Sequence, residues 1–531
     1  MAEQSTAAGQ MKLAVFMHGN SNYHIAGWRH PEAYADSAEN VARWTEFART
    51  MERGKLDMLF IADSVGIYGV SNPELLSRKD AIDKFEPFTA LAALSMVTTN
   101  IGLVATCHST YTDPYTVARM FNSLDHLSGG RAGWNFVTGG NREGALNYSQ
   151  ELMQHGDRYD RGEEFADVVL GLWDSFEADA FIRDKASGRY LDPAKMHILN
   201  HKGPHFSVRG PLSSARSPQG RPVIVQAGAS EPGKELTARV ADVMFTAQAS
   251  FEQAQAFYAD VKGRLAKFGR SPDSLKIMPG VSIYVGRTAA EAEEKFQELN
   301  DLIPIEVALA TFGEAMGGID LSVYPLDGPV PEFKGNAARM SSPPAYVALA
   351  RRENLTLRQL AKRAVASKHH FLLKGTATEI ADVLEHWFVN KAADGFNLLP
   401  AYLPGSLDDF VDQVVPELQR RGLFRSEYEG RTLRENLGLP IPESSHALAR
   451  QRTDGLAFDA AALMRLPGPI EARVLRMGLR RLAGDREVAQ EHVESARAVL
   501  SGKSGAVDVP GGRVELSRGI LVLVERKVSP K

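Results

Sequence analysis

The chain has a single cysteine, Cys107, and no apolar run long enough to cross a membrane. One thiol excludes an internal disulfide framework and any metal site built from several thiolates. No apolar run reaches the roughly 18 residues that a membrane-spanning helix needs. The N-terminal segment also lacks the basic stretch and apolar core of a signal peptide. We therefore expect a cytoplasmic protein.

The chain also lacks a large excess of charge of either sign, because 61 basic and 65 acidic residues leave a net charge of -4 over 531 residues. So small an imbalance gives no reason to expect nucleic acid or an anionic membrane as a partner of the whole chain. Apolar residues make up 44% of the chain and charged residues 24%, as in soluble globular proteins. The length suits one large barrel with insertions, or two to three domains.

Eight short apolar segments alternate with segments of helical pattern over most of the chain. This alternation predicts an α/β protein with a parallel sheet, and eight strands favour a closed (β/α)8 barrel of the TIM type. A doubly wound open sheet is the alternative, but no G-x-G-x-x-G motif follows an early strand. The predicted strands are residues 12–17, 58–63, 101–106, 130–138, 223–228, 243–247, 276–285 and 395–400.

Two long insertions interrupt this alternation, at residues 177–221 and at about residues 304–374. Uninterrupted loops of such length are usually functional or leave the core. We expect both segments to shape a substrate pocket, since loops carry much of the functional variation of barrel proteins.

The segment from residue 130 to residue 164 contains the largest group of candidate site residues. Its predicted strand ends at Asn135, Val137 and Thr138, and the helix that follows begins with His155 and Tyr159. The i, i+4 spacing puts the imidazole and the phenol on one helix face, and the first turn of a helix favours anions. The pattern indicates a pocket for a phosphorylated, planar ligand. An ordinary strand–loop–helix unit with a capped start is the alternative.

Four histidines lie after predicted strands: His18, His24 and His30 after the first, and His108 after the third. Loops at this end of a barrel carry function, so each is a candidate for contact with a substrate, although packing is an equally good explanation. Metal ligation is not expected, because no carboxylate or fixed i, i+4 pair accompanies these residues. Position alone assigns no catalytic acid or base. Cys107 is expected to be a small buried hydrophobe.

Several long motifs follow one another in order between residues 11 and 442. They include G-W-R-H, L-D-H-L-S-G-G-R-A-G-W-N-F-V-T, H-G-D-R-Y-D-R-G-E-E-F and R-S-P-Q-G-R-P-V-I-V-Q-A-G-A-S. In these motifs the chain resembles the bacterial-luciferase-like flavin monooxygenases, and among them the subgroup of nitrilotriacetate and dibenzothiophene-sulfone monooxygenases. The resemblance implies a TIM-type barrel over residues 11–442.

The resemblance also implies an oxidoreductase that uses FMN as FMNH2, supplied by a separate NAD(P)H:FMN oxidoreductase, with O2 as cosubstrate. A flavin C4a-hydroperoxide would insert one oxygen atom into a small organic substrate that is a xenobiotic or contains sulfur or nitrogen. The resemblance further implies a homo-oligomer, either a dimer or a tetramer. A reductase-type or F420-type barrel is an alternative. The FMN contacts carry over onto Asp63, Thr106, His155, Tyr159 and Ser230, and the pocket neighbours onto Asn135, Val137, Thr138 and Gly228.

The tail of the chain differs from the rest. Residues 446–531 contain 15 basic and 10 acidic residues, an excess of 5 positive charges. Residues 455–531 resemble the C-terminal domain of tRNA(Ile)-lysidine synthetase, but the S-G-G-x-D-S loop of its catalytic half is absent, so lysidine synthesis is not implied. We expect a small α+β appendage, with a basic helix at residues 472–482. An RNA-binding protein with a catalytically idle barrel is the alternative function, although a solvated basic face is the more common role of such a helix.

Overall fold

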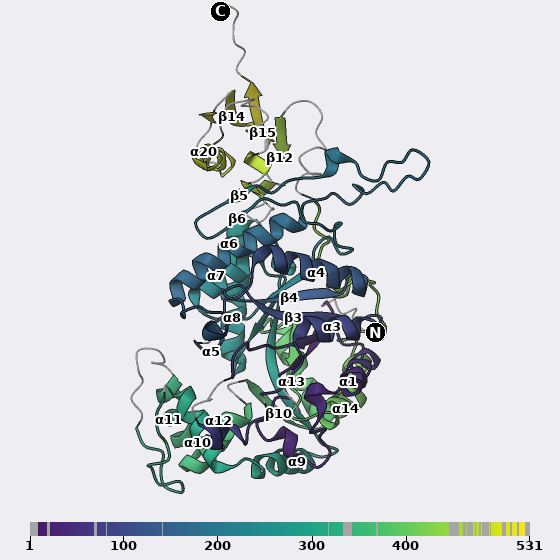
Figure 1. Ribbon diagram of the computed structural model, residues 1–531. Coiled ribbons are helices and arrows are strands. Elements are labelled where there is room, and N and C mark those ends of the chain that lie inside the picture. The colour runs from purple at the N-terminus through teal and green to yellow at the C-terminus, as the bar shows by residue number, and fades with distance from the viewer. Residues whose placement is uncertain are drawn as a thin grey trace, which may run out of the picture.

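Eight parallel strands of the computed structural model form a closed barrel (Figure 1), which confirms the predicted fold. In spatial order they are β1 (Lys12–Met17), β2 (Met58–Ile61), β3 (Gly102–His108), β4 (Ala132–Val137), β7 (Val223–Gln226), β8 (Val243–Thr246), β9 (Lys276–Val285) and β11 (Gly395–Leu398), and β11 pairs with β1 to close the ring. The structure describes residues 9–18, 22–67, 72–80, 82–140, 142–316, 318–332, 342–367, 370–444, 456–459, 463–464, 471–472, 474–476, 479, 488, 490–501, 506–509, 512–517 and 520–525.

Helices follow the strands and pack around the barrel (Figure 1). Their starts are fixed by local chemistry: the Asp113 carboxylate accepts from backbone N–H groups of the first turn of α4, and Pro114 occupies the first helical position, where its missing N–H costs nothing. The helices are α1 (Val41–Arg53), α3 (Pro87–Ser95), α4 (Pro114–Ser128), α6 (His155–Trp173), α7 (Glu231–Val240), α8 (Phe251–Arg264), α9 (Ala289–Asp301) and α13 (Ala377–Val389), and then α14 (Gly405–Asp409) and α15 (Val415–Arg420) joined by a π-helical turn (Phe410–Val414).

The interior of the barrel is filled by apolar side chains, and a late segment closes its floor. Leu433, Leu437 and Leu439, in and after the short helix α16 (Leu433–Asn436), pack into the same cluster as the inward-facing strand residues. Beside them the Arg434 guanidinium forms a buried ion pair with Asp242 at 2.8 Å. The strand residues of this cluster are Ala14, Met58, Phe60, Val104, Val223, Val225, Val243 and Met278.

The second insertion is more ordered than the sequence suggested. Between residues 304 and 374 lie three helices, α10 (Ile305–Ala315), α11 (Ser342–Glu353) and α12 (Leu357–Ser367), which share an apolar core of their own. The strand β10 (Phe371–Gly375) was not predicted, and it pairs in parallel with the second half of β9 outside the ring. The long β9 therefore serves both the barrel and this insertion.

The first insertion, by contrast, is irregular as predicted. Its regular elements within the described residues are a short 3-10 helix (Pro193–Lys195) and a small hairpin of β5 (His201–Lys202) and β6 (Ser207–Val208). The Glu164 carboxylate of α6 accepts hydrogen bonds from His201 and from the backbone of the hairpin loop. The insertion is thus fastened to the helix that follows β4. Two further short helices, α2 (Pro73–Leu76) and α5 (Arg142–Asn147), lie in loops after β2 and β4.

The C-terminal part forms a second sheet, at the yellow end of the chain in Figure 1. Its strands β12 (Leu456–Asp459), β13 (Ala506–Val509), β14 (Gly512–Ser517) and β15 (Ile520–Glu525) pair antiparallel in the order β12-β15-β14-β13, as expected for the β part of a small α+β appendage. The helix α20 (Gln490–Leu500) packs on this sheet in a separate apolar cluster. The predicted basic helix at residues 472–482 lies partly outside the described residues, and those described within it at 472, 474–476 and 479 are helical.

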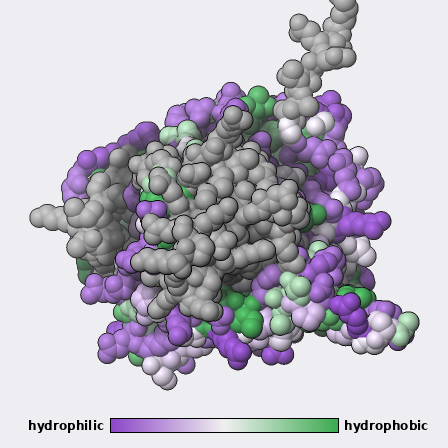
Figure 2. Space-filling model, turned by 90° about the horizontal axis from the view of Figure 1, so that it is seen from above, coloured by the Kyte–Doolittle hydropathy of each residue, from purple (hydrophilic) through white to green (hydrophobic). Residues whose placement is uncertain are grey.

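Figure 2 shows a largely hydrophilic surface with small scattered apolar patches, wherever the placed residues face the viewer. No helix within the described part of the chain is long and apolar enough to cross a membrane. The described residues also hold no cluster of three or more histidine, cysteine, aspartate or glutamate side chains that could bind a metal ion.

Candidate active site

The polar ends of β3 and β4 lie side by side at the C-terminal mouth of the barrel. Thr106 is the register partner of Asn135, whose amide donates to the Thr106 hydroxyl at 2.8 Å. That hydroxyl donates in turn to the carbonyl of Ile61 on β2 at 2.7 Å. The amide oxygen of Asn135, a residue 4% exposed, has no hydrogen-bond partner among the described residues. A ligand that brings an N–H or O–H donor to the mouth would satisfy it.

Asp63 follows β2 directly and brings a carboxylate to the same mouth. Its carboxylate accepts from the backbone N–H of Ser64 at 2.8 Å and pairs with the Lys84 ammonium at 3.1 Å. Lys84 lies in the segment before α3, where no sequence pattern had marked it. This cation offsets the charge of the Asp63 carboxylate at the mouth.

Tyr159 and Ser230 meet across the gap between α6 and α7. The Ser230 hydroxyl donates to the phenol oxygen of Tyr159 at 3.2 Å and accepts from the backbone N–H of Gly233 at 3.3 Å, which makes Ser230 the N-cap of α7. The tyrosine ring is packed in the main apolar core and only 9% of the residue is exposed. Two hydroxyl groups are therefore held together at the first turn of a helix, where the backbone favours an anion.

Two glycines keep the backbone close to these hydroxyls. A Cβ atom at Gly228 would lie 2.5 Å from the Gln226 amide, and one at Gly233 would lie 2.8 Å from the carbonyl oxygen of Gly228 and 3.0 Å from the Tyr159 hydroxyl. No side chain fits at either position without a shift of its neighbours. The loop after β7, the start of α7 and Tyr159 thus form a tight cradle of the kind that holds a phosphate group through backbone and hydroxyl donors.

The remaining predicted site residues are less well defined. α6 begins at His155, as predicted, but the side chain of His155 lies outside what the structure describes. Val137 ends β4 and is half-buried, next to His108 in the register. Thr138 turns its methyl group toward α6, where a Cβ at Gly162 would approach it to 3.0 Å. Thr138 therefore packs between β4 and α6.

The predicted residues share one arc of the mouth. β2, β3, β4 and β7 are neighbours in the barrel, so Asp63, Thr106, Asn135 and Gly228 belong to four consecutive strand ends. At about 4.8 Å per strand spacing, this arc spans on the order of 14 Å. A phosphorylated ligand with its phosphate at Ser230 and its ring toward Thr106 would bridge it. The cradle and the orphaned Asn135 oxygen fit such a ligand, whereas the assignment of each side chain to a flavin stays a prediction.

An aromatic wall lines the opposite side of the mouth. The rings of Phe16 on β1 and Phe245 on β8 stack at 5.1 Å, and the imidazole of His370 stacks on Phe245 at 5.3 Å. Tyr23 meets His370 edge-on at 5.5 Å. Sequence analysis missed His370, because it ends the second insertion and only the fold brings it to β8. The wall supplies an apolar, water-poor surface facing the polar arc.

The three histidines of the first loop have distinct surroundings. His18 stacks on Phe16 at 5.8 Å, so it borders the aromatic wall. The ring of His24 accepts from the backbone N–H of Ala26 at 3.2 Å, which stabilises the turn it belongs to. His30 stacks on Tyr402 at 3.8 Å. Among the described contacts of these three histidines, the stacking of His18 on Phe16 is the one that reaches the aromatic wall.

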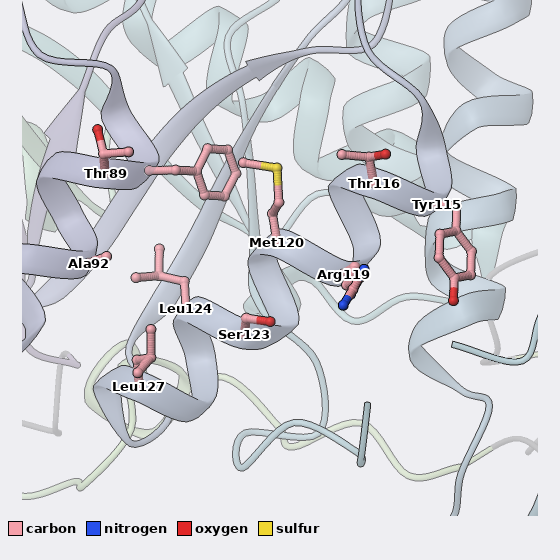
Figure 3. Close-up of a pocket in the computed structure, with 10 residues that line it drawn as sticks. Thr89, Ala92, Tyr115, Thr116, Arg119, Met120, Ser123, Leu124 and Leu127 are labelled. Carbon is pink, nitrogen blue, oxygen red and sulfur yellow. The ribbon is translucent and has the colours of Figure 1, made fainter. Parts of the chain in front are cut away.

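A separate groove of about 430 Å³ lies between α3 and α4 on the outside of the barrel (Figure 3). None of the predicted site residues lines it, so it is distinct from the mouth. Its lining residues are Phe88, Thr89, Ala92, Tyr115, Thr116, Arg119, Met120, Ser123, Leu124 and Leu127.

A closed parallel barrel with polar side chains gathered at its C-terminal mouth defines a TIM-barrel protein, a class whose ligands bind at that mouth. Comparison with known families narrows this class. The model of the family described as luciferase-like monooxygenase matches residues 19–394. The chain belongs to the luciferase-like monooxygenase family, as its motifs indicated.

Individual relatives match over most of the chain. The nitrilotriacetate monooxygenase component A of Aminobacter aminovorans is 51% identical over 449 residues, covering 82% of this chain and 98% of that protein. The N-acetyl-S-(2-succino)cysteine monooxygenase of Bacillus subtilis (strain 168) is 50% identical, with the same coverage of both chains. A crystal structure of a riboflavin lyase with modified FMN and riboflavin superposes with a TM-score of 0.72 at 34% identity, covering 82% of this chain and 97% of that chain.

Proposed function

We propose that this protein is the oxygenase of a two-component system, using FMNH2 from a separate NAD(P)H:FMN oxidoreductase and O2 to insert one oxygen atom into a small organic substrate. The observation that carries the proposal is the pairing of Tyr159 with Ser230 at the start of α7, on the same rim as the Thr106–Asn135 pair. A relative of 51% identity that is named as component A of a monooxygenase supports the need for a second component.

Different residues of the mouth would bind different parts of the flavin. Tyr159, Ser230 and the first-turn N–H groups of α7 would bind the phosphate as hydrogen-bond donors. Asp63 and the orphaned oxygen of Asn135 would accept from the ribityl chain or the ring edge, and Thr106 would fix the orientation of Asn135. When bound, reduced FMN supplies the electrons that activate O2.

The aromatic residues of the mouth would exclude water from the site. The aromatic wall of Phe16, Phe245 and His370 faces the polar arc with apolar surface. A dry site strengthens the electrostatic contacts to the ligand and protects reactive oxygen species from side reactions with water. The protein thus orients the flavin and the substrate, and the oxygen chemistry belongs to the cofactor.

We propose a substrate that contains nitrogen or sulfur and is small enough to enter between the polar arc and the aromatic wall. Two relatives at half identity support this class, because their names specify nitrilotriacetate, an amine, and N-acetyl-S-(2-succino)cysteine, a thioether. The two insertions at residues 177–221 and 304–374 would set the choice of substrate, since both are attached to the strands or helices that border the mouth.

A reconstituted assay tests the proposal. Purified protein is mixed with a flavin reductase, NADH, FMN and O2, and aminocarboxylates, thioethers and sulfones are screened for consumption. Turnover should require FMNH2, so omission of the reductase or of FMN should abolish it, while chemically reduced FMN should restore it. Spectral titration with FMN and with the deazaflavin F420 separates the proposed cofactor from the alternative. Binding of F420 alone, or turnover independent of FMNH2, would rule the proposal out.

We also propose that the protein is a homo-oligomer. The groove between α3 and α4 is lined in part by apolar side chains that face solvent, with Leu127 57% exposed and Met120 38% exposed. A second copy of the chain would cover these side chains and remove their apolar surface from water. Light scattering of the purified protein tests this: a mass of one 58.0 kDa chain would contradict it, and Leu127→Asp should dissociate the oligomer.

We further propose two structural units, the monooxygenase barrel at residues 11–442 and the appendage at residues 455–531. The separate sheet and apolar cluster of the C-terminal part support this division. The relatives support it as well, because 82% of this chain already covers 98% of their length.

A further inference from the structure

His108, the last residue of β3, lies at the mouth two positions beyond Thr106. Side chains alternate along a strand, so Val104, Thr106 and His108 point to the inside of the barrel in that order, and Cys107 points outward into the main apolar core. The inward face of β3 thus changes from apolar to polar toward the mouth, and His108 is its outermost group.

The imidazole of His108 is buried without the hydrogen bonds that burial normally demands. The residue is only 8% exposed, and neither ring nitrogen has a hydrogen-bond partner of normal geometry among the described residues, although the ring lies close enough to the backbone of Asp63 for this contact to raise its pKa. Leaving a buried polar atom unsatisfied costs roughly 1–3 kcal/mol, and native proteins keep few such atoms. In the buried His24, by contrast, one ring nitrogen accepts a hydrogen bond from the backbone N–H of Ala26.

The ring of His108 lies between an aromatic side chain and a glycine. Its aromatic neighbour is Tyr111, tilted at 5.7 Å between ring centroids. On another side lies Gly139, whose φ is +61°, and a Cβ there would come within 3.3 Å of the His108 Nδ1. A glycine at this place keeps one edge of the imidazole uncovered by side chains, in a backbone conformation that other residues rarely adopt.

The charges near His108 decide its protonation state. Burial lowers the pKa of His108, Lys84 acts in the same direction, and the carboxylate and backbone of Asp63 offset this only in part. The imidazole is therefore neutral at pH 7, so that one nitrogen donates a hydrogen bond and the other accepts one. Such a group can bind a neutral polar edge without introducing a buried charge.

We propose that His108 is a ligand-binding residue of this mouth, whose imidazole hydrogen-bonds the molecule that occupies it. The inference rests on the proposed function for the nature of that molecule, which is either the polar edge of the flavin ring or a polar group of the substrate. The flavin is favoured by position, because His108 directly follows Thr106 on the inner face of β3 and lies beside Asp63, both assigned above to the flavin.

The test compares His108→Leu, which keeps the approximate volume but forms no hydrogen bond, with His108→Gln, which keeps a donor and an acceptor. The wild-type protein is first shown to bind FMN and to turn over a substrate, which tests the proposed function separately. FMN affinity is then measured by fluorescence quenching, substrate KM by turnover, and the melting temperature in the absence of ligand by calorimetry. Cys107→Ala is the matched control, since it alters the same strand on its opposite face.

If the inference is right, His108→Leu melts at or above the wild-type temperature without ligand, because unsatisfied buried atoms are removed. Its FMN dissociation constant rises roughly 3- to 10-fold, as expected for one lost hydrogen bond, and His108→Gln recovers most of the affinity. A rise in substrate KM with unchanged FMN affinity supports the same inference and identifies the substrate as the partner. Cys107→Ala changes neither constant.

Two results overturn the inference. Unchanged FMN affinity and unchanged KM in His108→Leu would show that the ring nitrogens contact neither ligand. A large loss of melting temperature with wild-type affinities in the folded protein would show that His108 is a packing group. Should His108→Leu fail to fold, the same comparison is made with His108→Asn and His108→Gln, whose affinities should then differ from each other.

Discussion

The cradle at the start of α7 makes a sharp prediction for Tyr159→Phe. This substitution removes one oxygen atom and leaves the ring, which is packed in the main apolar core. The phenol lies 3.2 Å from the Ser230 hydroxyl, and the two hydroxyls flank the first turn of a helix. If both bind the flavin phosphate, their loss should weaken FMN and leave riboflavin, which has no phosphate, unaffected.

The size of the effect follows from the kind of bond that is lost. A hydrogen bond to a charged group contributes about 1.5–3 kcal/mol, so the FMN dissociation constant of Tyr159→Phe should rise about 10- to 150-fold. Ser230→Ala removes a similar bond, and it also removes the N-cap of α7, which costs about 1 kcal/mol of stability. Tyr159→Phe should therefore change the affinity with little loss of stability, whereas Ser230→Ala should change both.

Fluorescence titration with FMN and with riboflavin provides the assay. The variant that carries both Tyr159→Phe and Ser230→Ala completes a double-mutant cycle. Because the two hydroxyls contact each other and would bind the same phosphate, the losses of FMN binding free energy in the two single variants should not add up to the loss in the double variant. Wild-type FMN affinity in both single variants, or an equal loss of FMN and riboflavin binding, would refute the placement of the phosphate at this helix.

Four further predictions concern the rest of the molecule. Arg434→Met leaves the Asp242 carboxylate buried without its cation, and urea denaturation should show a loss of roughly 3–5 kcal/mol in unfolding free energy. In the wild type, burial favours the protonated carboxyl but Arg434 outweighs it and lowers the pKa of Asp242 to about 2. The stability from this pair should therefore be full above the unfolded pKa of about 3.9 and be lost as the pH falls toward 2, as followed by melting temperature against pH. Burial raises the pKa of Cys107 to about 12, so a disulfide reagent should label it only in denaturant. A chain ending at Ser444 should keep its FMN affinity and its oxygenase activity.

Each of these has a control or a contrary outcome. Arg420→Met is the matched control for Arg434→Met, because Arg420 forms an exposed pair with Glu417 and such pairs contribute at most about 1 kcal/mol. Equal stabilities of the two variants would contradict the role given to the buried pair. Rapid labelling of native Cys107 would mean that the outer face of β3 is open to solvent. Loss of flavin binding on truncation would place part of the site in the appendage.

The alternating strands and helices of the barrel could be predicted from the sequence, because the residues that specify each element are neighbours in the chain. Every barrel strand is a short apolar run next to glycine, proline or polar residues, and helix starts such as Asp113-Pro114 carry their own capping chemistry. The polar residues at the strand ends followed from the same pattern, since all parallel strands of a barrel end at one mouth.

The rest depends on contacts between distant segments, which leave no local pattern. Lys84 pairs with Asp63, and His370 reaches Phe245 from the end of an insertion. β10 is a short strand that exists because the second half of β9 offers it an edge. The burial of the His108 imidazole is likewise a property of the assembled mouth, because the sequence indicates only that this residue follows a strand.

The leucines of α16 have a consequence for the order in which this protein can mature on the ribosome. The chamber formed by the eight barrel strands is open at its base until the segment around Leu433–Asn436 has been made. A nascent chain released before that point would present a ring of valines and methionines to water, a surface suited to chaperones. Completion of the barrel thus waits for synthesis of α16, and the appendage is synthesised only after it.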